Sequence, residues 1–311
     1  MLDDITKLDQ ENWQSYLERI YEHLKPSLQG DRGYIKKYKD YYHHDERRKE
    51  ELLTASNDFL SHVNISNLDM ELNEYGSEIY RINKSYQNIL FHDYMKVLDQ
   101  IVDLYDVSEM STILDAINGE NTVSLTIRHR LHSIISRIFM ESASQGNKSQ
   151  AGVAGEDIVL NMLEAIGLEK NVAYKTQHKS VSGSDTDFVF PYVEDNRDQD
   201  VEIFLGTQMS SNDRTRLIDS ELKPGGQKYL FTCNGMSFAK KTIQDIGLQI
   251  INKLKDGNVK IVCYKPELES EVDRLKLNPT KNNVQRLDYI ENFTITLGEF
   301  GAYLKDRYGT K

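Results

Sequence analysis

Cysteine and proline are scarce in this chain of 311 residues, which contains two cysteines and five prolines. Two cysteines, Cys233 and Cys263, cannot build a disulfide framework or, by themselves, a four-ligand zinc site. Both lie in apolar, β-rich segments, so we expect buried free thiols and a reducing, cytoplasmic compartment. The low proline content, with 39% hydrophobic and 28% charged residues, indicates a folded chain rather than a disordered one.

Long apolar segments are also absent. No stretch approaches the ~20 apolar residues of a transmembrane helix, and the opening residues MLDDITKLDQ contain no apolar signal core. We therefore expect no membrane partner. No phosphate-binding GxxxxGKS/T motif occurs, so we expect no nucleotide cofactor. The net charge of −11 argues against a protein that coats nucleic acid without specificity, but it allows one that reads DNA in a locally basic cleft.

The hydrophobic pattern changes near residue 145. Residues 1–145 carry apolar side chains at helical spacing, which predicts a helical region. Turn residues at 64–67 and at Gly76 predict breaks between helices. The segment SASQGNKSQAGVAG, residues 142–155, is small and polar and predicts a linker or an approach to an active site. The second predicted domain is therefore 146–311.

Strands and helices alternate in the second half. The segment AGEDIVLNMLEAIGL predicts an amphipathic helix that ends at Gly167. Five strand candidates follow it, namely NVAYKTQ, TDFVFPY, DVEIFLGTQ, KYLFTC and VKIVCY. A helix in SFAKKTIQDIGLQIINKLK joins the last two, and such a crossover predicts that they are parallel. The predicted fold class is α/β (α+β), with a mixed β-sheet flanked by helices on both faces.

Two acids stand where the second of these strands begins. Asp185 and Asp187 lie in SGSDTDFVF, and the next strand follows within about twenty residues. Acids at one end of adjacent strands can hold a divalent metal through hard oxygen ligands. A polar turn before a hairpin would explain the same residues without any metal.

Several segments taken in order are similar to a known enzyme core. GVAGEDIVLNMLEAIGL, SGSDTDFVF, FLGTQMSSNDRTRLIDSE and KYLFTCNGMS with VKIVCYK resemble the PD-(D/E)XK nucleases, in particular the type II restriction endonucleases of the CCGG-recognising group. The resemblance covers residues 150–265 and implies that 146–311 is the catalytic domain, which leaves the helical region 1–145 for dimerisation or DNA contact. Most such enzymes carry Glu-x-Lys on the second core strand, where this chain has Gly206-Thr207-Gln208.

The position of the missing acid fits that group. There the Glu has migrated to the following helix, 13 positions after the Lys, and Glu221 stands 13 positions after Gln208. The group also carries a basic–acidic–Arg triplet that begins four positions after the Lys. Here Asn212-Asp213-Arg214 begins four positions after Gln208, so both offsets agree with one alignment.

The resemblance implies Mg²⁺-dependent, sequence-specific hydrolysis of phosphodiester bonds in double-stranded DNA. Asp187 and Glu221 would supply carboxylates to Mg²⁺, together with a strand carbonyl near Thr207. Gln208 would orient the attacking water in place of Lys, as Gln does in some restriction endonucleases.

Two further acids, Asp185 and Glu156, are secondary candidates for the metal site. Glu156 is either a distal acid of the metal site or a charge at the start of a helix, which the helix dipole favours. Of the two readings we favour the helix start.

The triplet is the specificity element implied by the same resemblance. Asp213 can accept from cytosine N4, and Arg214 can bind guanine O6 and N7. Asn212 pairs best with adenine, and Arg216 lies near enough in sequence to touch phosphate or base. The segment SSNDRTR is also typical of an N-capped helix start.

A double-strand break requires two active sites, so we expect a homodimer on a palindromic or near-palindromic duplex. Two alternatives remain open. One is a non-catalytic DNA-binding or interaction protein with a degenerate nuclease fold. The other is a repair or mobile-element nuclease of the same superfamily.

Overall fold

The computed structural model of the chain describes residues 21–22, 25–26, 46–105, 121–179, 185–194, 198–208, 226–232 and 248–309. Side chains are described for all of these except 87–105, 121–132, 142–151, Asp185 and Gln208. The chain divides into two compact units, Met1–Glu50 with Asn83–Lys148 and Glu51–Ile82 with Ser149–Lys311. Since long helices run from one unit into the other, each unit is described by its own residues.

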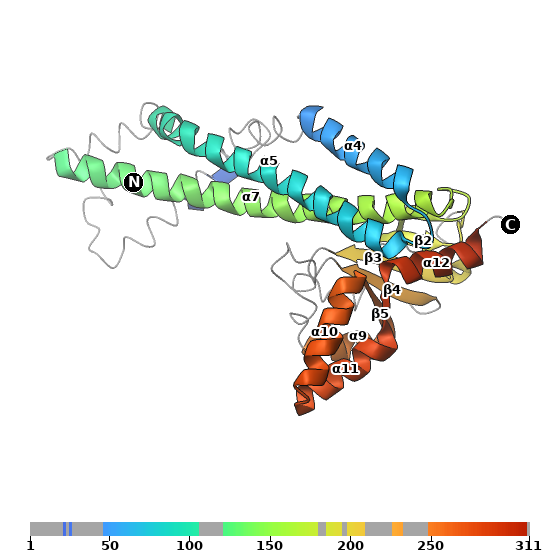
Figure 1. Ribbon diagram of the computed structural model, residues 1–311. Coiled ribbons are helices and arrows are strands. Elements are labelled where there is room, and N and C mark those ends of the chain that lie inside the picture. Colours follow the sequence, from blue (N-terminus) through green and yellow to red (C-terminus); the bar gives the residue numbers. More distant parts are fainter. Residues whose placement is uncertain are drawn as a thin grey trace. The chain divides into compact units, whose positions relative to one another are not determined.

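The first unit is helical throughout its described residues. It holds the beginning of α4 (Glu46–His62), the later part of α5 (Leu68–Tyr105) and the earlier part of α7 (Asn121–Ala165) (Figure 1). The buried side chains of α7 in this unit share one helix face, because they recur at helical spacing: Ile134, Ile135, Ile138 and Phe139. This agrees with the helical region predicted for the N-terminal part of the chain.

Two of the predicted helix breaks are wrong. Residues 142–155 lie inside α7, and Gly76 lies inside α5. A glycine within a helix costs only about 1 kcal/mol relative to alanine, so small residues weaken a helix without ending it when neighbouring turns are packed. The turn predicted at 64–67 is confirmed between α4 and α5, where the Asn64 backbone N–H donates to the Asn67 side chain at 2.6 Å.

The second unit is built on a six-stranded mixed sheet whose order follows the chain, β1-β2-β3-β4-β5-β6. The strands β1 to β3 form an antiparallel meander, and β3 to β6 are parallel. Their bounds are β1 Lys175–Lys179, β2 Asp185–Phe190, β3 Ile203–Gln208, β4 Gln227–Thr232, β5 Val259–Cys263 and β6 Thr294–Thr296. Four of the five predicted strands are confirmed, as is the parallel pairing of β4 with β5. The first, predicted at 171–177, is observed as β1, which begins four residues further on, and β6 was not predicted.

Helices cover both faces of this sheet, as predicted. Alternate strand residues such as Phe188, Leu205 and Phe231 share a buried core with the end of α7, the start of α5, and α12 (Leu297–Tyr308). The intervening residues, such as Val189 and Phe204, pack in a second core with α9 (Leu248–Asp256) and α11 (Lys281–Phe293). The twofold period of the strands therefore divides the apolar side chains between two helical layers.

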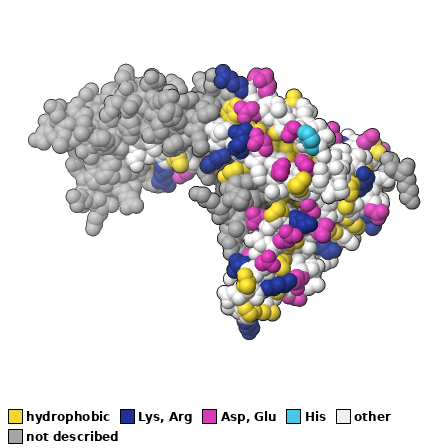
Figure 2. All heavy atoms as spheres, viewed as in Figure 1, with side chains coloured by type: hydrophobic (Ala, Val, Ile, Leu, Met, Phe, Trp, Pro, Cys, Tyr) yellow, Lys and Arg dark blue, Asp and Glu magenta, His cyan; other side chains and the backbone are white. Residues whose placement is uncertain are grey.

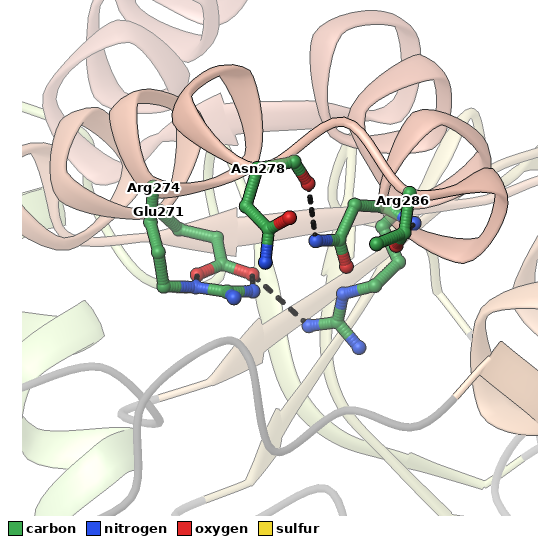
Figure 3. A network of polar contacts seen from close by, with 6 residues as sticks. Glu271, Arg274, Asn278 and Arg286 are labelled. Carbon is green, nitrogen blue, oxygen red and sulfur yellow. Dashed lines mark hydrogen bonds and ion pairs between the residues drawn. The ribbon is translucent and has the colours of Figure 1, made fainter.

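The C-terminal helices were not predicted, and a buried ionic network joins two of them. Glu271, on α10 (Lys265–Leu277), is 2% exposed and accepts two hydrogen bonds from Arg274, at 2.6 and 2.7 Å. Arg286 of α11 donates to the same carboxylate at 3.1 Å. Figure 3 shows both guanidinium groups directed at Glu271. The network places α11 against α10, next to the parallel half of the sheet.

Candidate active site

Asp187 is held in place by the neighbouring strand. In the β2–β3 register Phe188 lies opposite Leu205, which puts Asp187 opposite Gly206. Oδ2 of Asp187 accepts a hydrogen bond from the backbone N–H of Thr207 at 2.6 Å and another from Thr207 Oγ1 at 2.9 Å. Thr207 is only 8% exposed. Protein donors therefore set the orientation of the Asp187 carboxylate.

A second acid reaches this end of the sheet from α7. A Cβ added to Gly155 would lie 3.6 Å from Cβ of Thr207, so α7 passes close to the end of β3. Glu156 follows directly, and its Oε2 accepts a hydrogen bond from Gln177 Nε2 of β1 at 3.0 Å. Three strands and one helix thus contribute side chains to one small region, which holds Glu156, Asp187, Gln177 and Thr207.

The pKa of Glu156 responds to its burial and to the nearby charge of Asp187. Burial raises the pKa of Glu156 above its usual value, and the negative charge of Asp187 raises it further. The hydrogen bond from Gln177 acts in the opposite direction, since it stabilises the charged carboxylate. A cation between the two carboxylates would offset this repulsion.

The interpretation of Glu156 as a helix-start charge is wrong. The helix begins at Asn121, so Glu156 lies ten turns or so into it and far from its N-terminal dipole. The error followed from the predicted break at 142–155, which would have made Glu156 an early residue of a new helix. Its alternative assignment, an acid of the metal site, agrees with its position beside Asp187.

The donors present fit a hard divalent cation, because carboxylate oxygens are the ligands that Mg²⁺ prefers. Among the described side chains, no group of three or more His, Cys, Asp and Glu could hold a metal ion. Mg²⁺ keeps several waters and needs few protein ligands. The predicted second carboxylate, Glu221, lies outside the described residues.

Most of the predicted DNA-reading residues also lie outside the described part of the chain. This holds for Asn212, Asp213, Arg214 and Arg216, as it does for Glu221. For Asp185 and Gln208 the backbone is described and the side chain is not. Gln208 pairs with Thr232 at the end of β3, directly after Thr207, and Asp185 opens β2 opposite Lys179.

Two contributions to the site were missed by sequence reasoning. Thr207 was proposed only for its carbonyl, but its hydroxyl holds Asp187. Gln177 was seen only as part of a strand, but it contacts Glu156. A polar residue in a strand carries no signal of its cross-strand or helical partner, so neither contact could be found from the residue types.

Glu202, near the start of β3, takes no part in this region. Its Oε2 accepts from Arg307 Nε at 2.8 Å and from the Tyr308 hydroxyl at 2.7 Å, both at the end of α12. These contacts lower the pKa of Glu202, chiefly through the hydrogen bond from Arg307. Glu202 therefore ties the end of α12 to the start of the central strand β3.

Charges of both signs are interspersed on the described surface. Figure 2 shows Lys and Arg side chains alternating with Asp and Glu over the coloured part of the face in view. None of the helices in the described ranges has the length and apolar character needed to span a membrane.

The chain has no match among protein-family models, and no curated protein is found to be a relative of it.

Proposed function

We propose that this chain is a Mg²⁺-dependent endonuclease that cleaves double-stranded DNA at specific sequences, as type II restriction enzymes do. The observation that carries the proposal is the pair of acids: Thr207 holds Asp187, and α7 brings Glu156 to the same end of β3, where burial and then the charge of Asp187 raise its pKa. The helix, the Asp-bearing strand and the following strand meet in the order that the resemblance to PD-(D/E)XK nucleases implies.

Each side chain of the site has a role in this proposal. Asp187 and Glu156, with Glu221, bind the cation through oxygen atoms, and Thr207 fixes the orientation of Asp187. Gln208 positions the attacking water through its side-chain amide. A Mg²⁺ ion held by these oxygens would supply the Lewis acidity that makes this water nucleophilic and would neutralise charge at the phosphate.

Sequence specificity is assigned to the segment after β3. Asp213 and Arg214 would read a G·C pair in the major groove, Asn212 would favour adenine, and Arg216 would contact phosphate or base. Because one chain carries one such site, cleavage of both strands requires a homodimer related by a two-fold axis. A repair or mobile-element nuclease would share the same acids but not this specificity.

Cleavage of duplex DNA tests the proposal. The wild-type chain is incubated with Mg²⁺ and a pool of long duplexes of varied sequence, and the products are sequenced at their ends. We expect cuts at one short symmetric sequence, no cleavage by Asp187→Ala, and specific DNA binding by that variant close to wild type, since only the metal ligand is removed.

The control is Asp200→Ala, which removes an exposed acid on the short 3-10 helix Asp198–Asp200. This variant should cut like the wild type. Wild-type cutting by Asp187→Ala would refute the active-site assignment. If the wild type binds DNA but never cuts it, the non-catalytic alternative is correct.

A further inference from the structure

Gln177 has an unusual backbone for a residue inside a strand. Its φ is +51°, in the left-handed region, although it lies in the middle of β1. Thr176 pairs with Phe188 and His178 pairs with Thr186, so the register places Gln177 opposite Asp187. A side chain in the left-handed region meets steric strain that glycine avoids, and such strain is concentrated at functional sites.

The strained residue is also the one that contacts Glu156. Its amide Nε2 lies 3.0 Å from Oε2 of that carboxylate, which belongs to α7 and is 21 residues away in sequence. Gln177 is exposed, so its own amide would be solvated without this contact, whereas Glu156 is half-buried and gains a donor from it. The strained backbone of Gln177 does not stabilise the fold, and its exposed hydrogen bond adds little to the free energy of unfolding. Both features occur beside the two acids.

The two acids are held in the same way. Thr207 donates to one oxygen of Asp187, and Gln177 donates to one oxygen of Glu156. Both donors are neutral, so neither brings a positive charge that would replace a cation. Outer hydrogen bonds of this kind orient metal-binding carboxylates, and their loss typically weakens metal binding about 10–100-fold.

We propose that Gln177 is a positioning residue, whose strained backbone directs its amide to Glu156 and so orients that carboxylate with Asp187 toward one divalent cation. This proposal rests on the proposed function. It assigns to β1, an edge strand, a role in building the metal site.

Metal binding to the 311-residue chain without DNA tests this role. Calorimetry with Mn²⁺ as the probe gives the dissociation constant, and a thermal melt gives the stability of each variant. Gln177→Gly removes the amide and relieves the backbone, whereas Gln177→Met removes the donor and keeps the length of the side chain. Both should bind Mn²⁺ at least about 10-fold more weakly, and Gln177→Gly should melt at or above the wild-type temperature.

The matched control is Asn258→Gly, since Asn258 also has a φ of +51° and lies in the turn before β5. It should bind Mn²⁺ like the wild type. If both Gln177 variants bind Mn²⁺ with wild-type affinity while Asp187→Ala does not, the positioning role is refuted and the metal site stands. If Gln177→Gly loses stability together with binding, Gln177 is structural and the proposal is again refuted. If the wild type itself binds no Mn²⁺, the metal site and the positioning role both fall.

Discussion

Replacing Thr207 by valine should slow DNA cleavage without disturbing the fold. Valine keeps the volume of threonine and the strand carbonyl, and it loses only the hydroxyl that donates to Asp187 Oδ2 at 2.9 Å. The backbone N–H of residue 207 still donates to that oxygen, at 2.6 Å in the wild type. One of the two restraints on the carboxylate is therefore removed.

The expected loss of activity depends on the backbone hydrogen bond to Asp187 that the valine variant retains. Loss of an outer hydrogen bond to a metal ligand costs about 10–100-fold in metal affinity or activity, which corresponds to about 1.4–2.7 kcal/mol. Because the backbone donor is retained, we expect the lower end, about a 10-fold loss at limiting Mg²⁺. Thr207 is buried in a strand, where valine is favoured, so the melting temperature should change little.

The assay is the initial rate of duplex cleavage measured over a range of Mg²⁺ concentrations. Thr207→Val should raise the Mg²⁺ concentration for half-maximal rate, and Thr207→Ser, which keeps the hydroxyl, should restore it towards the wild-type value. A wild-type Mg²⁺ dependence in the valine variant would show that the hydroxyl does not position Asp187. An equal loss in the valine and serine variants would show that keeping the hydroxyl does not rescue the Mg²⁺ dependence, so the hydrogen bond to Asp187 would not be the cause of the loss.

Two further predictions concern stability in the C-terminal helices. Burial raises the pKa of Glu267 to about 7 from near 4.5, so the native state loses stability as pH rises between these values. Glu267→Gln removes this loss, so the melting temperature of the variant relative to the wild type should rise as pH rises through that range. The side chain is partly exposed, so the gain in the free energy of unfolding is about 1 kcal/mol or less. A difference in melting temperature between the variant and the wild type that stays constant from pH 4 to pH 8 would contradict the raised pKa of Glu267. Glu271→Gln should reduce the free energy of unfolding by about 3 kcal/mol, because it leaves Arg286 buried without its anion. Arg274→Ala, at a side chain that is 40% exposed, should cost about 1 kcal/mol or less; urea denaturation compares the two, and equal losses would refute this ranking.

Local patterns were sufficient to predict the central strands. The segments around Phe188, Phe204 and Phe231 are short, apolar and bounded by polar or glycine-containing turns, and each forms a strand. The helix predicted after β4 also indicated that the next strand, β5, is parallel to β4. A helix between two neighbouring strands returns the chain to the end of the sheet where the first strand began. Strand β6 has three residues, too few to produce a recognisable period.

The long helices show where local propensity fails. Residues 142–155 contain several glycines and serines, and Gly76 interrupts an apolar stripe, yet both lie within helices. Packing of the neighbouring turns outweighs a cost of about 1 kcal/mol per glycine. Tertiary contact also decided that Phe59 and Leu72, from the helical part of the chain, belong to the same core as Phe188 of β2.

The sequence by itself determined the mixed α/β class and the strand that carries Asp187, since these depend on residue type and spacing along the chain. The proposal of a metal-dependent nuclease came from the resemblance to PD-(D/E)XK nucleases and stays a prediction. Only the tertiary structure decided that Glu156 lies beside Asp187, that the hydroxyl of Thr207 holds one of these acids, and that Gln177 contacts the other. The physical reason is that these contacts join residues 20 or more positions apart. Strand register and the path of α7 set such contacts, and neither leaves a periodic signal in the sequence.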